Sequence, residues 1–317
     1  MGQVHDLILH QGIENARRIA SLDKNDRLCV DAAHEVMADE RGRIGITHAG
    51  FAIAALPHKR TQESVWERDN GHIKLLVESG LDSAKRPIGI PYGSIARMIL
   101  LYLQTQAVRT KSRDVELGAS MNAWLGAMRI TVGGNSYRLV REQAHRISRC
   151  RLTFFRRTQG AEMVTNGAFI RDAILPITPD SSGQGCLWQE RVRLDEGFYQ
   201  SLIEHPLPLR EAAIRKISNR SMAIDLYIWL AYRLHVLRAP LFITWPALHG
   251  QFGEGYKEVR FFRRDVLPSL RLALAVYPEA RVEIDEKKGL SLFPSPPPVL
   301  DQHSVRRLNL KSLPDYT

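Results

Sequence analysis

The sequence predicts a helix-rich α+β fold with two tandem domains that share one architecture. Two observations predict it: apolar residues recur at helical spacing through most of the chain, and short alternating stretches with glycine-containing turns separate those segments. The order helix, short strand, helix, helix, hairpin occurs in residues 91–164 and again in residues 221–292. A chain of 317 residues has room for two or three domains.

The sequence of the first part of the chain predicts a small extension, made of helix and β-strands, ahead of the first domain. Residues 1–43 have mixed charge and weak helical spacing, which indicates a loosely packed, flexible helical lead-in. Residues 44–56 are small and apolar, and Asp69-Asn70-Gly71 lies between apolar flanks, which is typical of a hairpin turn. We therefore expect residues 44–205 to hold this β element followed by the first domain.

Residues 91–164 contain the elements of the first domain. In chain order these are helix 91–107, an edge strand or turn at 115–118, helix 120–128, helix 137–150, and a hairpin with its tip at 158–160. Asn135 or Ser136 can cap the third helix through its side chain. This order is typical of a winged helix, in which the hairpin is the wing.

The second domain follows a polar loop at residues 179–185, a strand at 188–194 and a helix at 196–204. His205-Pro206-Leu207-Pro208 marks the boundary, so we expect the second domain at residues 206–298 and a tail at residues 299–317. Its elements, in chain order, are helices 210–217 and 221–237, strand 242–244, helices 246–252 and 256–276, and hairpin 282–292. Pro268 is expected to kink or end the helix that contains it.

The charge favours a polyanionic partner such as DNA. The net charge is +10, and 34 of the 44 basic residues are arginine, whose planar fork suits phosphate and guanine. Codon usage in a GC-rich genome would explain the excess of arginine equally well. The three cysteines are far apart and no apolar run reaches the length of a membrane span, so we expect a cytoplasmic protein without membrane contact.

The motifs of several enzyme classes are missing from the sequence. It contains no P-loop, no GxGxxG after a strand, and no HExxH or other histidine cluster with metal spacing. We therefore expect no enzymatic activity, no catalytic residue, no cofactor and no metal ion. Trp124, Trp229 and Trp245 lie among apolar neighbours and are expected in the core rather than stacked on bases.

Basic residues are concentrated in the first domain, where residues 97–157 contain twelve basic and three acidic side chains. Helix 137–150 has an apolar stripe, and basic residues recur on the opposite face at helical spacing. In a winged helix this third helix enters the major groove, where arginine can bind guanine and a carboxylate can accept from cytosine. A charged helical face can also be merely solvated, and that interpretation stays open for both domains.

The residues expected to contact DNA come from the third helices, their preceding turns and the hairpins. The base-reading candidates are Arg138, Arg141, Glu142, His145 and Arg149 in the first domain and Lys257, Arg260, Arg263 and Arg264 in the second. Asn135, Ser136, Tyr137 and Tyr256 lie at the starts of the two helices. The phosphate-binding candidates are Arg109, Lys111, Arg113, Arg156, Arg157, Lys287 and Lys288.

Three blocks of the sequence resemble the plasmid-encoded RepA replication initiators of proteobacterial plasmids. They begin GIPYGSIARMILLYLQ (residues 89–155), LPLREAAIRKISNRS (207–235) and ALAVYPEARVEI (273–284). The likeness extends over about residues 45–298. Separately, FFRRDVLPSL at residues 261–270 resembles the second recognition helix of tandem winged-helix initiators that bind iterons, which implies that Arg263 and Arg264 face DNA and that Pro268 is an accepted kink.

The resemblance implies a function at a plasmid origin. It implies binding of repeated double-stranded sites, local opening of the duplex with the host initiator, and recruitment of the replicative helicase. Related initiators bind repeats as monomers and repress their own genes as homodimers, which controls copy number. A plasmid transcriptional repressor or partition regulator with the same domains is the alternative, and a protein-interaction scaffold with solvated basic faces is a third interpretation.

Overall fold

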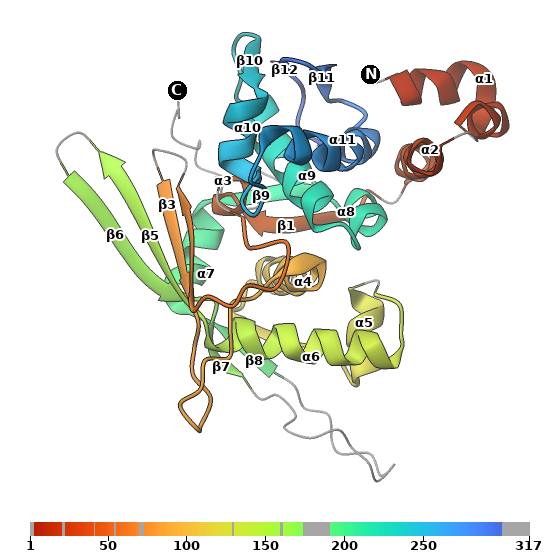
Figure 1. The fold of residues 1–317 in the computed structure, drawn as a ribbon. Helices are drawn as coiled ribbons and strands as arrows, with labels where there is room; N and C mark the ends of the chain where they lie inside the picture. Colours follow the sequence, from red (N-terminus) through yellow and green to blue (C-terminus); the bar gives the residue numbers. More distant parts are fainter. Residues whose placement is uncertain are drawn as a thin grey trace. The chain divides into compact units, whose positions relative to one another are not determined.

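The computed structural model describes residues 3–20, 23–40, 42–53, 55–69, 73–128, 130–158, 161–173 and 191–299 (Figure 1). The chain forms two compact units. The central unit is Leu56–Glu204, and the split unit combines Met1–Ala55 with His205–Thr317. Both contain helices and small antiparallel sheets, so the expected α+β class is confirmed. The expected loop at residues 179–185 and the tail beyond residue 299 lie outside the described residues.

The central unit contains two sheets and four helices among its described residues. Its elements are β2 (Val65–Asp69), β3 (Ile73–Glu78), α4 (Gly93–Thr110), β4 (Asp114–Glu116), α5 (Met121–Ala127), α6 (Gly134–Arg149), β5 (Arg151–Thr158), β6 (Ala161–Ala168), β7 (Ile170–Ala173), β8 (Arg191–Leu194) and α7 (Glu196–Glu204). The sheet orders are β2-β3-β5-β6 and β4-β8-β7. The hairpin expected around Asp69 is therefore confirmed as β2 and β3, and the short edge strand as β4.

The wing of the first winged helix differs from the expected one. β4 pairs with β8, and β8 pairs with β7, so β7 and β8 are the hairpin that completes the three-stranded sheet after α4, α5 and α6. The hairpin at residues 151–168 instead joins β3, with Leu75 opposite Phe154. The expectation that this hairpin is the wing was wrong, because β5 pairs with β3 and the hairpin extends the β2–β3 sheet instead.

The split unit contains the second winged helix and the N-terminal helices. Its elements are α1 (Gln3–Ile19), α2 (Lys24–Met37), β1 (Ile44–His48), α3 (Gly50–Ile53), β9 (Pro206–Arg210), α8 (Glu211–Ile217), α9 (Ser221–Leu234), β10 (Leu241–Thr244), α10 (Trp245–Phe252), α11 (Val259–Ala275), β11 (Arg281–Asp285) and β12 (Gly289–Phe293). The sheet order β10-β12-β11 repeats the arrangement of β4-β8-β7. The expected order of elements in the second domain is therefore observed.

The N-terminal segment is packed on the split unit. α2 packs against α11 and α8, and His5 bonds through Nε2 to the carbonyl oxygen of Ala275 at 2.8 Å. β1 pairs with β9, with Ile46 opposite Pro208. The interpretation of residues 1–43 as a loose lead-in, and the grouping of residues 44–55 with the first domain, therefore differ from the structure. Contacts of this kind join segments about 160 residues apart or more, which local sequence patterns do not reveal.

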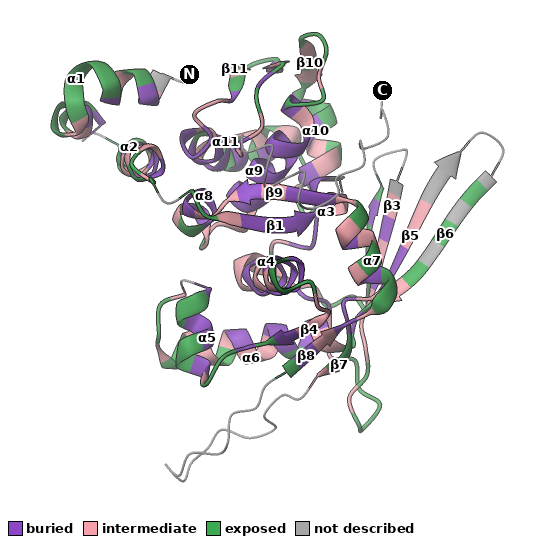
Figure 2. Cartoon of the chain, turned by 180° about the vertical axis from the view of Figure 1, so that it is seen from behind, coloured by how far each residue is buried: buried purple, intermediate pink, exposed green. Residues whose placement is uncertain are grey.

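Each unit has its core around one apolar helix, α4 in the central unit and α9 in the split unit (Figure 2). Trp124, Trp229 and Trp245 are 1%, 4% and 2% exposed, which confirms them as core residues rather than stacking platforms. α11 is one helix that contains Pro268, because its second half is held by packing against α9 and α2. The expected end of the helix at Pro268 is therefore not observed. No helix among the described residues is long and apolar enough to cross a membrane.

Candidate nucleic-acid interface

α6 separates an apolar face from a basic face, as the sequence predicts. Val140, Ala144 and Ile147 are buried, and the helix packs on α4. The basic side chains that are exposed on the other face are those of Arg138, His145 and Arg149. Arg141 is half-buried, and its Nε is buried without a hydrogen-bond partner among the described residues.

Glu142 faces a buried arginine and is already neutralised inside the unit. Its carboxylate lies 2.9 Å from Arg146 Nη2 and accepts a hydrogen bond from the Tyr92 hydroxyl at 3.3 Å. Arg146 is only 4% exposed; it donates to the carbonyl oxygen of Ile90 at 3.0 Å and lies over the Tyr92 ring. Both contacts use Oε1 of Glu142, so this carboxylate is a weaker candidate for accepting from cytosine than an unpaired one, and its contact with DNA stays a prediction.

The start of α6 also differs from the expectation. The helix begins at Gly134 with Gly133 as its N-cap, so neither Asn135 nor Ser136 caps it. Asn135 Oδ1 instead accepts from Arg138 Nη2 at 3.0 Å, which holds that arginine near the helix start. The Tyr137 hydroxyl donates to Asn122 on α5, so this hydroxyl is engaged within the unit.

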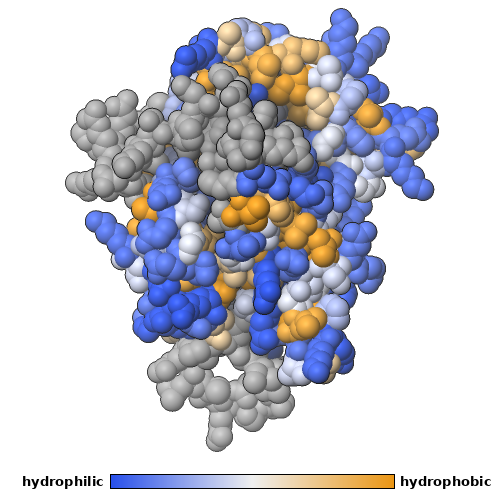
Figure 3. Space-filling model, turned by 90° about the vertical axis from the view of Figure 1, so that its left-hand side faces the viewer, coloured by the Kyte–Doolittle hydropathy of each residue, from blue (hydrophilic) through white to orange (hydrophobic). Residues whose placement is uncertain are grey.

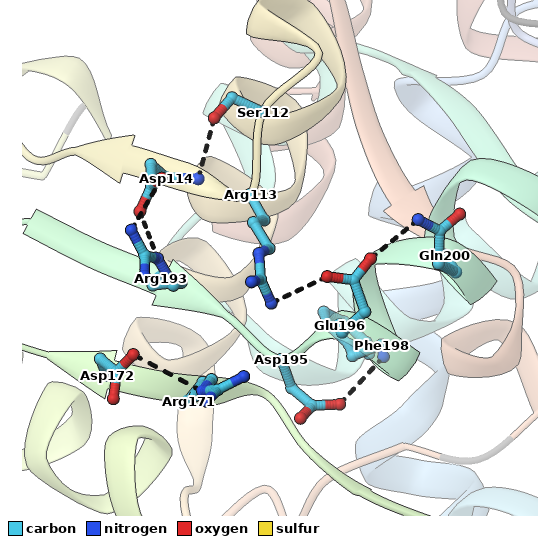
Figure 4. A network of polar contacts seen from close by, with 10 residues as sticks. All are labelled: Ser112, Arg113, Asp114, Arg171, Asp172, Arg193, Asp195, Glu196, Phe198 and Gln200. Carbon is cyan, nitrogen blue, oxygen red and sulfur yellow. Dashed lines mark hydrogen bonds and ion pairs between the residues drawn. The ribbon is translucent and has the colours of Figure 1, made fainter.

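The end of α4 and the loop after it contain three of the phosphate-binding candidates. Arg109 and Lys111 are exposed, and Lys111 ends α4 in a left-handed conformation with φ 52°. Arg113 lies 2.9 Å from Glu196 at the start of α7 (Figure 4). Its guanidinium therefore holds α7 near β4, which makes Arg113 a weaker phosphate-binding candidate than exposed Lys111.

The wing strands contain basic residues that the sequence reasoning missed. Arg171 on β7 and Arg191 on β8 have side chains 62% and 57% exposed, with their carboxylate partners Asp172 and Glu116 no closer than 3.8 Å. Arg193 is different, because two hydrogen bonds to Asp114 hold it and lower the pKa of that carboxyl (Figure 4). The signal that would have found Arg171 and Arg191 is the pairing of β4 with β8, which no local pattern shows. Arg156 and Arg157 lie on β5 instead, outside the wing.

α11 presents an exposed aromatic ring between two arginines. Phe261 is 40% exposed, and the guanidinium carbons of Arg260 and Arg264 lie 4.6 Å and 5.6 Å from its ring centroid. Both arginines also pair with neighbouring carboxylates, those of Glu258 and Asp265, at 2.8 Å and 2.7 Å. These pairs are exposed and contribute little stability, so a phosphate could replace the carboxylates.

The other candidates of the split unit lie around α11. Arg263 is half-buried on the helix, while Tyr256 and Lys257 precede it. Burial, and then the Asp265 carboxylate, raise the pKa of Tyr256. Lys287 and Lys288 are exposed in the turn between β11 and β12, where Asp285 Oδ1 accepts from both backbone amides.

The exposed surface mixes apolar and charged groups. Figure 3 shows one face on which hydrophobic residues gather in several groups, with hydrophilic residues between them. The described residues contain no group of three or more side chains suited to a metal ion. Burial raises the pKa of Cys29 to about 11 and of Cys150 to about 12, so neither thiol is a reactive nucleophile at neutral pH.

Both units have the element order and sheet order of a winged helix, which places the chain in the tandem winged-helix class. A crystal structure of domains 2 and 3 of RctB is similar over 79% of this chain and 98% of that one, with a TM-score of 0.51 and 14% identity. At this identity the likeness concerns the fold. A second structure of RctB domains 2–3 covers 75% of this chain and 85% of its own, with a TM-score of 0.47 and 15% identity.

The family is identified by sequence. Residues 90–245 match the family model of the plasmid encoded RepA protein, so this part of the chain belongs to the RepA family. The match begins just before α4 and ends at the start of α10, and thus includes all of α6. Over these residues the chain is thus similar to plasmid-encoded RepA replication proteins. No curated protein matches it.

Proposed function

We propose that the chain binds repeated double-stranded sites at a plasmid origin, opens the adjacent duplex together with the host initiator, and recruits the replicative helicase. In this proposal α6 and α11 lie in successive major grooves about one helical turn apart. The protein acts in the cytoplasm, catalyses no reaction, and represses its own gene as a homodimer.

The observation that carries the proposal is the exposed face of α6. Arg138, His145 and Arg149 are exposed there, whereas the one acidic residue of the helix, Glu142, is paired with buried Arg146. The described residues of α6 therefore add no unpaired carboxylate to this face, and the nearby carboxylate of Asp82 is paired with Arg86. Arginine can bind guanine bidentately in the major groove, so the same side chains can supply both affinity and sequence preference.

α11 supports the proposal with a different surface. Arg260 and Arg264 flank Phe261, so the helix offers two cations and an apolar ring on its exposed side. Apolar side chains contact the methyl group of thymine, and arginine contacts guanine or phosphate. The two units can thus read different bases within one repeat.

A footprint on the DNA that flanks its own gene tests the proposal. We expect two protected blocks about 10 bp apart within each repeat. A plasmid that carries only this gene and its flanking repeats should replicate in a suitable host. Failure to replicate while the protein still represses its promoter would favour the transcriptional repressor or partition regulator. The absence of any protection at physiological salt would leave only the protein-interaction scaffold.

The affinity for DNA should rise as the pH falls, through His145. Burial, followed by the Arg149 guanidinium, lowers the pKa of His145 in the free protein. A nearby phosphate stabilises the charged imidazole, so binding raises this pKa and takes up a proton. For each unit by which DNA binding raises the pKa of His145, the affinity becomes about tenfold higher once the pH lies below the pKa of both the free and the bound protein.

The measurement is fluorescence anisotropy of a labelled repeat between about pH 5.5 and pH 7.5, on either side of the ordinary histidine pKa. The His145→Ala variant should lose the part of the pH dependence that this imidazole causes. The Lys24→Gln variant, which changes an exposed residue of α2, should keep it. Equal pH dependence in the wild type and in His145→Ala would show that His145 lies away from the DNA.

A further inference from the structure

We infer that the turn at residues Leu81–Pro87, here named the basic turn, is a second DNA-backbone-binding element of the central unit. The inference rests on the proposed binding of α6 to DNA and adds a contact beyond the helix and the wing. The basic turn follows β3 and leads to α4. Its ligand would be the phosphate backbone of the duplex next to the base pairs that α6 reads.

The basic turn is closed by one carboxylate. Asp82 accepts at Oδ1 from the backbone amides of Ala84 and Arg86, both at 2.9 Å, and at Oδ2 from Arg86 Nε at 2.9 Å. The Asp82 amide donates in return to the carbonyl oxygen of Arg86 at 2.9 Å. These bonds give the turn a defined shape, so its side chains can be presented without a large cost in conformational entropy on binding.

The ends of the basic turn are fixed to the C-terminal part of α6. At Gly80 an added Cβ would lie 2.2 Å from the carbonyl oxygen of Arg149, so only glycine allows this approach. At Gly89, φ is +95° and an added Cβ would lie 2.1 Å from Arg146 Nη1. Arg149 Nη1 also donates to the carbonyl oxygen of Leu81 at 3.4 Å. The turn must therefore keep its position relative to α6.

The basic turn presents positive charge beside the exposed face of α6. Lys85 and Arg86 are exposed; Arg86 neutralises Asp82, and Lys85 has no ion-pair partner among the described residues. Leu81 is 53% exposed at the base of the turn. Figures 1 and 2 both show the segment after β3 reaching past the level of α6, away from α4, near the end of that helix beside which β7 and β8 lie. A duplex against α6 would therefore meet this turn.

The test replaces both cations by neutral residues of similar length, Lys85→Gln with Arg86→Gln. The matched control is Lys24→Gln with Arg27→Gln, which removes the same charge from exposed positions of α2. Binding of a random-sequence duplex and of the duplex flanking the gene is measured against salt concentration. The plot of log K against log salt has a negative slope, and each lost phosphate contact makes it less steep by about 0.9.

We expect the basic-turn variant to lose about 1 to 2 units of slope on both duplexes and hydroxyl-radical protection at one edge of the footprint, with unchanged thermal unfolding. The control should keep the wild-type slope and footprint. A basic-turn variant that matches the wild type, or a control with the same loss, would overturn the inference while leaving the function of α6 intact. Failure of the wild type to bind either duplex would overturn both.

Discussion

Replacing Arg146 by alanine should lower the free energy of unfolding by about 3 kcal/mol, at the lower end of the range for breaking a buried ion pair. The guanidinium is 4% exposed and joins Glu142, the carbonyl oxygen of Ile90 and the ring of Tyr92. Its loss leaves the carboxylate of Glu142 with only the Tyr92 hydroxyl as a donor, and it removes the side-chain donor to the carbonyl oxygen of Ile90. The effect stays at the lower end because the side chain of Glu142 is 24% exposed and keeps some contact with water.

Chemical denaturation followed by circular dichroism measures this loss. The matched control is Arg138→Ala on the same helix, which removes an exposed arginine and should change stability by less than about 0.5 kcal/mol. Equal stability of the two variants would mean that Arg146 does not hold α6 to the segment around Ile90. Because Gly89, which follows the basic turn, lies against the Arg146 guanidinium, Arg146→Ala should also weaken DNA binding indirectly.

Replacing Arg138 and Arg149 together by alanine should weaken binding to the repeat by about a hundredfold or more. A base-reading arginine contributes about 1 to 3 kcal/mol, and each 1.4 kcal/mol is a factor of ten. Both side chains are exposed on α6, so the protein should unfold as the wild type does. Titrations of the repeat and of random-sequence duplex, at one salt concentration, give the specificity ratio directly.

The comparison of the two duplexes decides the role of each arginine. Loss on the repeat with little change on random DNA assigns a side chain to base reading, whereas equal losses on both assign it to phosphate. Arg141→Ala should have a smaller effect than the exposed pair, because Arg141 is half-buried. Unchanged specificity in the double variant would remove α6 from the reading surface and would leave α11 as the candidate.

Part of the candidate site follows from local pattern alone. The spacing of Val140, Ala144 and Ile147 predicts which side of α6 is buried, and the structure confirms it. The burial of Arg146 is an example that the local pattern does not predict. Arg146 lies beside Ile147 at the edge of the stripe, and its long side chain reaches the carbonyl oxygen of Ile90, 56 residues away in the sequence. Pairing with such a distant group decides whether an arginine is a core residue or a ligand-binding one.

The sequence by itself determined the order of the elements, the two winged-helix copies and the concentration of basic residues in the first, because helical periodicity, turn residues and charge are local properties. Only the tertiary structure decided that β7 and β8 form the wing, that residues 1–55 belong with the second copy, and that Glu142 is paired inside its unit. The reason is physical: strand pairing and buried ion pairs depend on hydrogen bonds between segments far apart in the chain, and the burial of each side chain follows from those contacts.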